Sequence, residues 1–271
     1  MDHAAVAQAA VEKFIAEEAR NLADADKRAK AMAGLCILLT QLQEPSVPKE
    51  LEDAIPSIVE LTAHSEDRSI QANACAVLSG LCACTDELQA KCIALGAVEK
   101  VLALVQSVAD TEERTVQLNA LGSLTELLRD NEPKAEELVA AGGLEPILRL
   151  CDPALPERLQ EAAADVVCSI ACSDSTRAAL SEQGAVSKLA ALLATPNNDV
   201  RVRALMGLGM LLSKNQPNQL LLAKDMAAVK QLMAIMRQQE DPDCRIVARD
   251  LFAGLAANTD CKEHVAAAMR A

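Results

Sequence analysis

Apolar residues recur along this chain with the spacing of helices that bury one face. The clearest such stretch ends at Ala171 and has apolar side chains at Leu159, Ala162, Ala163, Val166, Val167 and Ile170. These positions follow the i, i+3, i+4, i+7 pattern of an amphipathic helix. Two shorter apolar segments precede it, at 136–141 and 144–150, and a glycine pair separates them. Residues 136–171 are therefore predicted to form three helices, with a glycine corner after the first.

The same pattern recurs at a regular interval. Gly96 and Gly184 stand at corners like that of Gly142, and the spacing of these three glycines gives a repeat slightly longer than 40 residues. Continuing the interval in both directions places further corners near Asp53 and Asp225. A helical repeat of this length predicts an α-solenoid, in which stacked repeats bury one continuous core.

The sequences around these corners resemble those of armadillo repeats. Residues 96–98 (Gly-Ala-Val), 184–186 (Gly-Ala-Val) and 53–56 (Asp-Ala-Ile-Pro) each precede an apolar helix and resemble the G-A-I-P-x-L-V-x-L-L signature. Residues 75–81 (Cys-Ala-Val-Leu-Ser-Gly-Leu) resemble the later A-L-x-x-L-S-N-L signature. The resemblance covers nearly the whole chain. It implies an all-α fold, a right-handed α-solenoid of about six armadillo-type repeats with helical caps.

We expect a single armadillo-repeat domain over residues 1–271. Its predicted parts are an N-terminal cap with a first partial repeat, four central repeats, and a last repeat with a C-terminal helix, at 1–52, 53–95, 96–141, 142–183, 184–224 and 225–271. The helix from Ala4 to Arg20 is predicted to cap the solenoid, because a terminal repeat must cover one apolar face. Its inward residues are predicted to be Val6, Ala10 and Phe14, with Val11 and Ile15 beside them.

The composition limits what this chain can bind. It is 51% hydrophobic but contains no Trp, no Tyr and only two Phe, so its core must be aliphatic. A pocket for a planar cofactor is more often lined by aromatic rings, and we therefore expect no cofactor and no small-molecule substrate. The net charge of −13 and the lack of stacking rings disfavour nucleic acid as a partner, since phosphate binding needs cations.

The ten cysteines are predicted to be free thiols. Five of them, Cys36, Cys75, Cys82, Cys168 and Cys172, fall inside predicted helices, where small apolar side chains pack well. We expect no secretory segment at the start of the chain and no membrane insertion, because no apolar run reaches 18 residues. These features favour a reducing compartment, and we predict a cytoplasmic protein.

The residues that could carry catalysis or bind a metal do not form a recognisable site. The sequence has no C-x-x-C pair, and Cys261 with His264 has no second half. The other histidines, His3 and His64, have no nucleophile suggested beside them. The segment Gly207-Leu208-Gly209 resembles the start of a dinucleotide fingerprint, but it lies in a predicted helix and lacks the third glycine. We therefore expect no metal site and no enzymatic activity. The two glycines of this segment are expected to let neighbouring helices pack closely.

The resemblance implies that the third helix of each repeat lines a concave groove. In peptide-binding members of the family, an Asn on this helix holds the ligand backbone. The equivalent positions here are Ile37, Gly80, Glu126, Ser169, Met210 and Gly254, none of them Asn. A Trp common one turn earlier in nuclear-import receptors is replaced by Ala33, Ala76, Gly122, Asp165, Met206 and Asp250. The extended-peptide mechanism is therefore not expected.

The predicted binding surface is a mixed patch on these third helices. An apolar methionine pair flanked by carboxylates and one guanidinium suits a basic or helical protein partner, because Met adapts to irregular surfaces and Arg anchors interfaces. The protein-binding residues are predicted to be Glu126, Asp165, Ser169, Arg203, Met206, Met210 and Asp250. The alternative is that another face of the solenoid binds the partner.

We interpret the chain as a non-enzymatic scaffold or adaptor that holds another protein within a larger assembly. The resemblance also supports a different hypothesis, because short armadillo domains act on Hsp70 chaperones as nucleotide-exchange factors. Stimulated release of ADP from an Hsp70 would distinguish the second hypothesis from the first.

Overall fold

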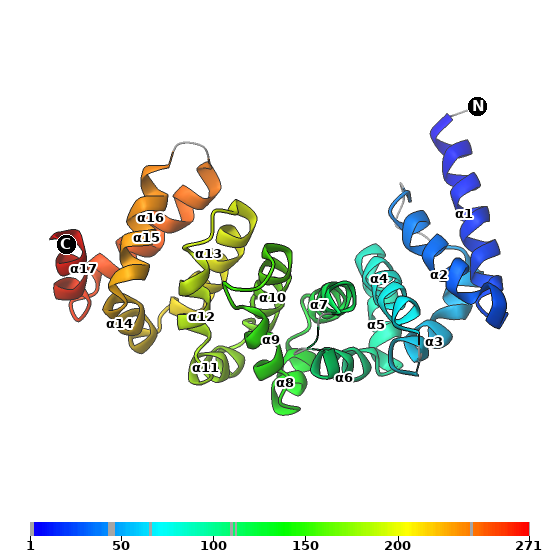
Figure 1. Ribbon diagram of the computed structural model, residues 1–271, viewed down its shortest axis with the longest axis horizontal. Helices are drawn as coiled ribbons and strands as arrows, with labels where there is room; N and C mark the ends of the chain where they lie inside the picture. Colours follow the sequence, from blue (N-terminus) through cyan, green and yellow to red (C-terminus); the bar gives the residue numbers. More distant parts are fainter. Residues whose placement is uncertain are drawn as a thin grey trace. The chain divides into compact units, whose positions relative to one another are not determined.

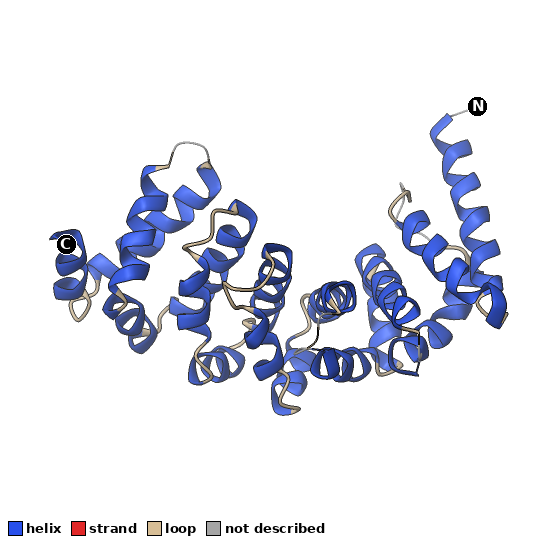
Figure 2. Ribbon diagram, viewed as in Figure 1, coloured by secondary structure: helices blue, strands red, loops and turns tan. Residues whose placement is uncertain are grey.

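The protein is almost entirely helical. The computed structural model describes residues 3–42, 47–64, 67–108, 111, 113–238 and 241–270. Over these residues the chain forms helices joined by short loops, with no strand (Figure 2). This confirms the all-α prediction. The chain divides into two compact units, Met1–Asn131 and Glu132–Ala271.

The first unit consists of two layers of helices (Figure 1). The long helices α2, α4 and α7 pack side by side, and α1, α3 and α6 form a second layer against them, while α5 packs near α3, α4, α6 and α7. The helices of this unit are α1 (His3–Asn21), α2 (Ala25–Leu39), α3 (Lys49–His64), α4 (Arg68–Cys84), α5 (Asp86–Ala94), α6 (Ala97–Val108) and α7 (Arg114–Leu128).

The second unit repeats this arrangement. The long helices α10, α13 and α16 form one layer, and α9, α12 and α15 pack against them. The short helices α8, α11, α14 and α17 pack against members of these layers. The helices are α8 (Glu132–Ala140), α9 (Leu144–Leu150), α10 (Glu157–Ile170), α11 (Asp174–Glu182), α12 (Ala185–Leu192), α13 (Asn198–Leu212), α14 (Gln216–Lys224), α15 (Met226–Arg237), α16 (Pro242–Ala257) and α17 (Lys262–Arg270). We refer to α2, α4, α7, α10, α13 and α16 as the third helices.

Three of the predicted corners depend on glycine. Gly96, Gly142 and Gly184 have φ angles of 76°, 76° and 80°, a left-handed conformation that costs other residues about 1–2 kcal/mol. A Cβ atom at Gly142 or Gly184 would meet nothing within 4 Å. The requirement for glycine there is therefore conformational, because the backbone must reverse between two helices within one residue.

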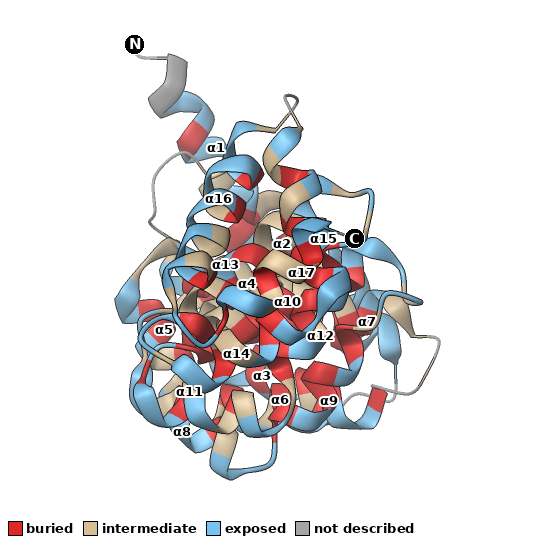
Figure 3. Cartoon of the chain, turned by 90° about the vertical axis from the view of Figure 1, so that its left-hand side faces the viewer, coloured by how far each residue is buried: buried red, intermediate tan, exposed pale blue. Residues whose placement is uncertain are grey.

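The core consists mainly of aliphatic side chains, and Figure 3 colours the buried residues red along the helices. Leu124, Val167 and Leu208 occupy equivalent positions on α7, α10 and α13, and each is 0% exposed. Burying a side chain of this size contributes about 1.5–3 kcal/mol. Aliphatic side chains therefore fill the space between the helix layers, and no aromatic core is needed.

The predicted inward face of the first helix is wrong for Val6, Ala10 and Phe14 and right for Ile15. Val6 and Phe14 are 55% and 56% exposed and Ala10 is exposed too, whereas Ile15 is buried together with Ala16 and Ala19. Because α1 packs on both α2 and α3, it turns its small alanines toward them, and these allow a close approach that Phe14 would prevent. The helix is apolar on more than one side, so its periodicity alone did not select the buried face.

A glutamine in the first turn of three third helices holds the preceding segment. The side-chain amides of Gln71 and Gln117 donate to the carbonyl oxygens of Thr62 at 3.2 Å and Val108 at 2.6 Å. The amide of Gln160 donates in the same way to the oxygen of Leu155 at 2.6 Å. All three glutamines are buried. We call these contacts the glutamine clasps, and each fixes the start of a third helix to the chain before it.

Candidate protein-binding groove

Most of the predicted binding residues lie on the third helices of the second unit. Asp165 and Ser169 lie on α10, Arg203, Met206 and Met210 on α13, and Asp250 on α16. Each is partly or well exposed, and Met206 is 43% exposed. Glu126 lies on α7 in the first unit, so it is described separately below.

A groove lies beside the methionine pair. One hollow of about 970 Å³ is lined by Met206, Met210 and Val247 among others, and a second of about 320 Å³ contains Asp250 and Leu251. The two hollows share lining residues. We define the α13/α16 groove as the surface formed by Met206, Gly209, Met210, Ser213, Val247, Asp250, Leu251 and Gly254. It therefore brings together three of the predicted residues, the two methionines and Asp250.

Two glycines keep the α13/α16 groove open. A Cβ atom at Gly254 would meet nothing within 4 Å, and one at Gly209 would meet only the Leu251 Cδ2 atom, at 4.0 Å. By contrast, a Cβ at Gly207 would approach the Leu189 Cδ1 atom to 2.8 Å. The expectation of close helix packing is thus confirmed for Gly207. Gly209, two residues later, contributes open space instead.

The charged residues predicted on α10, α13 and α16 are engaged in ion pairs, and Arg203 and Asp165 do not line the groove. The Arg203 Nε atom lies 2.9 Å from the Asp165 Oδ1 atom, and both side chains are partly buried. Asp250 pairs with Arg249 at 3.6 Å, and its side chain is 69% exposed. Exposed pairs contribute about 0–1 kcal/mol. Asp165 is therefore neutralised by its neighbour, whereas Asp250 remains accessible to a cation on another molecule.

Glu126 takes part in a structural corner of the first unit. Its Oε2 atom lies 3.4 Å from the Arg129 Nε atom, and its backbone oxygen accepts a hydrogen bond from the Gln89 amide at 2.8 Å. The Arg129 guanidinium also donates to the Cys82 carbonyl oxygen at 2.8 Å. These contacts join α4, α5 and α7.

The ten cysteines are free, as predicted. Burial raises the pKa of the Cys75 and Cys151 thiols to about 12, so both are protonated at neutral pH, and a thiol is a poor nucleophile in that form. Several thiols serve instead as weak donors between helices. Cys36 and Cys168 donate to the carbonyl oxygens of Asn73 and Arg203 at 3.3 and 3.6 Å.

The described residues contain neither a cluster of metal ligands nor a helix that could cross a membrane. No group of three or more His, Cys, Asp or Glu side chains among them is placed to hold a metal ion. The side chains of His3 and His64 lie outside the described part. In the described part of the chain, each helix is too short or too polar to cross a membrane.

Sequence reasoning missed the openness of the groove and the glutamine clasps. Gly254 and Val247 gave no signal because a glycine and a valine within a helix are compatible with tight packing. Buried glutamines were missed because Gln is mostly a surface residue. Their recurrence in the first turn of three third helices is a signal that could have been found.

The chain resembles known proteins in its structure. No family model matches the chain, and no curated protein matches it. Solved structures do match over most of its length. A designed armadillo repeat protein is similar at 21% identity and a TM-score of 0.75, covering 89% of this chain and 99% of that chain.

Two further structures show the same similarity. A designed armadillo repeat protein in complex with the peptide (KR)4 has 20% identity and a TM-score of 0.73, covering 89% of this chain and 98% of that chain. An engineered protein has 22% identity and a TM-score of 0.77, with 90% and 99% covered. At such identities the likeness concerns the fold alone. The chain therefore has the fold of the armadillo repeat, an α-solenoid.

Proposed function

We propose that this chain is a non-enzymatic scaffold or adaptor that binds a protein partner in the α13/α16 groove. The observation that carries the proposal is the joint exposure of Met206 and Met210 beside a hollow of about 970 Å³. Apolar surface that adjoins a concavity typically marks an interaction site. The armadillo fold supports this, because it is typically a binding scaffold.

The groove suits a helical partner better than an extended peptide. Met210 and Gly254 stand where an extended ligand would need Asn, and neither side chain can donate or accept hydrogen bonds along a peptide backbone. Two methionines can adapt to the aliphatic side chains of a helix. We propose a partner helix with aliphatic residues over Met206 and Met210 and a basic residue opposite the exposed Asp250.

We also propose that the protein works in a reducing compartment such as the cytoplasm, as a subunit of a larger complex. The ten unpaired thiols support this proposal, since oxidising compartments favour disulfides. The single domain over residues 1–271 and the repeat boundaries also remain predictions.

The test is capture of the partner by the folded chain and by a double variant, Met206→Ser with Met210→Ser. Cross-linking and mass spectrometry would first identify the protein that contacts the groove. We expect its affinity to fall at least tenfold in the variant, about 1.4 kcal/mol. Circular dichroism would show that both proteins are folded.

The matched control is Met226→Ser with Met269→Ser. These methionines are 46% and 60% exposed on α15 and α17 and do not line the groove. Equal loss in both double variants, or loss in neither, would reject the groove as the site. Stimulated ADP release from an Hsp70 that survives the groove substitutions would favour the exchange-factor alternative.

A further inference from the structure

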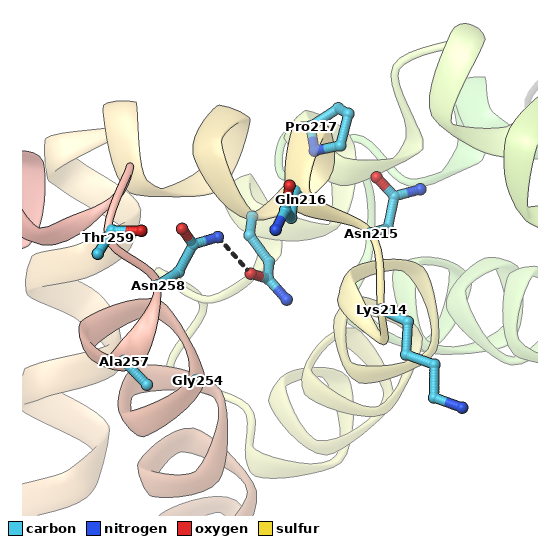
Figure 4. A pocket seen from close by; sticks show the side chains of 9 residues that line it. Lys214, Asn215, Gln216, Pro217, Gly254, Ala257, Asn258 and Thr259 are labelled. Atoms are coloured by element: carbon cyan, nitrogen blue, oxygen red, sulfur yellow. Dashed lines mark hydrogen bonds between the residues drawn. The ribbon is translucent and has the colours of Figure 1, made fainter.

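A polar pocket adjoins the α13/α16 groove and differs from it in chemistry (Figure 4). The pocket has a volume of about 670 Å³ and lies between the start of α14 and the end of α16. Gly254 lines both the pocket and the groove, and Gln219 lines the pocket and the smaller of the two hollows. Lys214 lines the pocket and the larger hollow, which also contains Asp174 and Arg177. A partner segment bound in the groove can therefore place one of its side chains in the pocket.

The pocket carries a single positive charge. Among the described residues that line it, Lys214 is the one charged residue and is exposed, and none is a carboxylate. No ion pair of Lys214 is present within the described ranges. The remaining lining residues are amides, one hydroxyl and small or apolar residues. In a chain of net charge −13, this pocket attracts an anionic group locally.

The amides around the pocket use their oxygen atoms within the protein. The Gln219 Oε1 atom accepts from the Asn258 Nδ2 atom at 2.7 Å, and the Asn258 Oδ1 atom accepts from the Asp260 backbone at 3.0 Å. Figure 4 shows the first of these bonds as a dashed line from Asn258. The Asn215 oxygen likewise accepts from the Asn218 backbone, at 3.0 Å.

This arrangement leaves hydrogen-bond donors available at the pocket. Each side-chain amide carries two N–H groups. Asn258 gives one to Gln219, and Gln219 gives one to the Leu212 carbonyl oxygen at 2.9 Å, so a second N–H remains on each. Gln216 is exposed at the pocket as well. A cation surrounded by N–H donors is complementary to a carboxylate, which accepts through both oxygens.

We propose that this pocket binds the side-chain carboxylate of an Asp or Glu carried by the partner segment that fills the groove. The proposal rests on the proposed function, because an exposed lysine and a few amides bind a free carboxylate only weakly. A carboxylate on a segment already held at Met206 and Met210 has a high effective concentration at Lys214. The partner segment therefore carries charges of both signs, with a basic residue opposite Asp250 and an acidic residue at Lys214.

The test uses a phage-displayed library of helical peptides. The library has aliphatic residues at i, i+4 and i+7 and random residues at the flanking positions. Selection against the folded full chain, with counter-selection against Met206→Ser with Met210→Ser, yields peptides that depend on the groove. We expect an Asp or Glu to be enriched at one flanking position. A selected peptide is then synthesised with an amidated C-terminus, so that only its side chain supplies a carboxylate.

Charge reversal at Lys214 tests the contact directly. Fluorescence anisotropy should show at least tenfold weaker binding for Lys214→Asp, and the same loss for the peptide with Glu→Gln. Pairing Lys214→Asp with a Glu→Lys peptide should restore affinity to within about threefold, as a double-mutant cycle requires. Lys214 has a φ of 54°, and Asp130 adopts the same angle after α7. Aspartate is therefore compatible with this backbone.

The control is Lys224→Asp, an exposed lysine at the other end of α14 that does not line the pocket. If Lys224→Asp weakens peptide binding as much as Lys214→Asp does, the loss comes from the change in net charge, and the proposal is overturned. Groove-dependent peptides without an acidic preference would overturn it while leaving the groove intact. Failure to recover any groove-dependent peptide would reject both proposals. If Lys214→Asp is unfolded, Gln216→Glu places a carboxylate at the same pocket and must give the same loss.

Discussion

The third helices α4 and α7 are locked together, whereas α13 and α16 leave a groove between them. In the first pair, the Asn119 amide on α7 donates to the Ala72 oxygen on α4 at 2.9 Å. The Ser123 hydroxyl donates to the Cys75 oxygen at 2.6 Å, and Ser123 is 0% exposed. In the second pair, the Cys244 thiol contacts the Asn198 oxygen at 3.7 Å, and the α13/α16 groove lies farther along the helices.

The difference follows from the side chains at equivalent positions. Val247 and Leu251 of α16 stand where α7 has Asn119 and Ser123, so α16 lacks the donors that would lock it to its neighbour. On the other helix, α13 has Met206 and Met210 where α4 has Ala76 and Gly80. Hydrogen bonds and small residues hold α4 and α7 together. Aliphatic side chains and partly or fully exposed glycines leave a groove between α13 and α16.

The largest expected effect comes from placing one leucine in each helix pair. Ser123→Leu should destabilise the protein by about 3 kcal/mol, because it removes a buried hydrogen bond and overpacks the interface. Gly254→Leu should be neutral or stabilising by about 0.5–1 kcal/mol, since its Cβ meets open space and glycine is a poor helix former. Urea denaturation gives both values. Similar destabilisation by the two substitutions would mean that the α13/α16 groove is as tightly packed as the locked pair.

The second effect concerns pH and the buried Cys75 thiol of the locked pair. Its pKa is raised to about 12 by burial, whereas a cysteine thiol that is not buried has a pKa of 9.0. Above about pH 9 the unfolded chain loses this proton and the folded chain keeps it, so the free energy of unfolding falls between about pH 9 and pH 12. Between pH 8 and pH 10 the expected loss from Cys75 is about 1.4 kcal/mol.

Denaturation at pH 8 and pH 10 measures this loss. Cys75→Ala should remove about 1.4 kcal/mol of the pH dependence, although it lowers stability at both pH values by creating a cavity. The control, Cys172→Ala, removes an exposed thiol and should keep the full dependence. An unchanged slope in Cys75→Ala would show that water reaches this thiol and that the locked pair opens readily.

The smallest expected effect compares the stability lost when a hydrogen-bonding side chain or an aliphatic side chain is removed from a helix interface. Asn119→Ala should destabilise the protein by about 1 kcal/mol, because the hydrogen bond from the Asn119 amide to the Ala72 oxygen is lost. Val247→Ala at the equivalent position should have a smaller effect, about 0.5 kcal/mol, because the side chain is already partly exposed. Thermal unfolding by calorimetry would measure both. A larger loss for Val247→Ala would reverse the order of tightness that we assign to the two pairs.

The sequence predicted most of the fold because its signals are local. Left-handed corners at Gly96, Gly142 and Gly184 follow from the freedom of glycine, and the stripe of Leu159 to Ile170 selects one buried face. Where a helix is apolar on several sides, as α1 is, the buried face depends on the shape of its neighbours. The pattern alone therefore placed Phe14 inside.

The site was predicted less completely than the fold. The position of Met206 and Met210 on one face of α13 follows from helical spacing. The ion pair of Arg203 with Asp165 depends on the distance between two helices, and the space around Gly254 depends on what is absent beside it. Neither can be read from a local pattern. The donors around Lys214 are likewise brought together only by the meeting of α14 and α16.

The glutamine clasps have a consequence for how such a chain can change during evolution. Gln117 donates to the oxygens of Val108 and of Thr111, so it ties the end of α6 and the following loop to the start of α7. Gln160 ties the loop, at Pro153 and Leu155, to the start of α10. Because each loop is held to the helix that follows it, we expect insertions in these loops to leave the third helices undisturbed. These loops are therefore natural places for new recognition elements, and for grafted sequences in a designed variant.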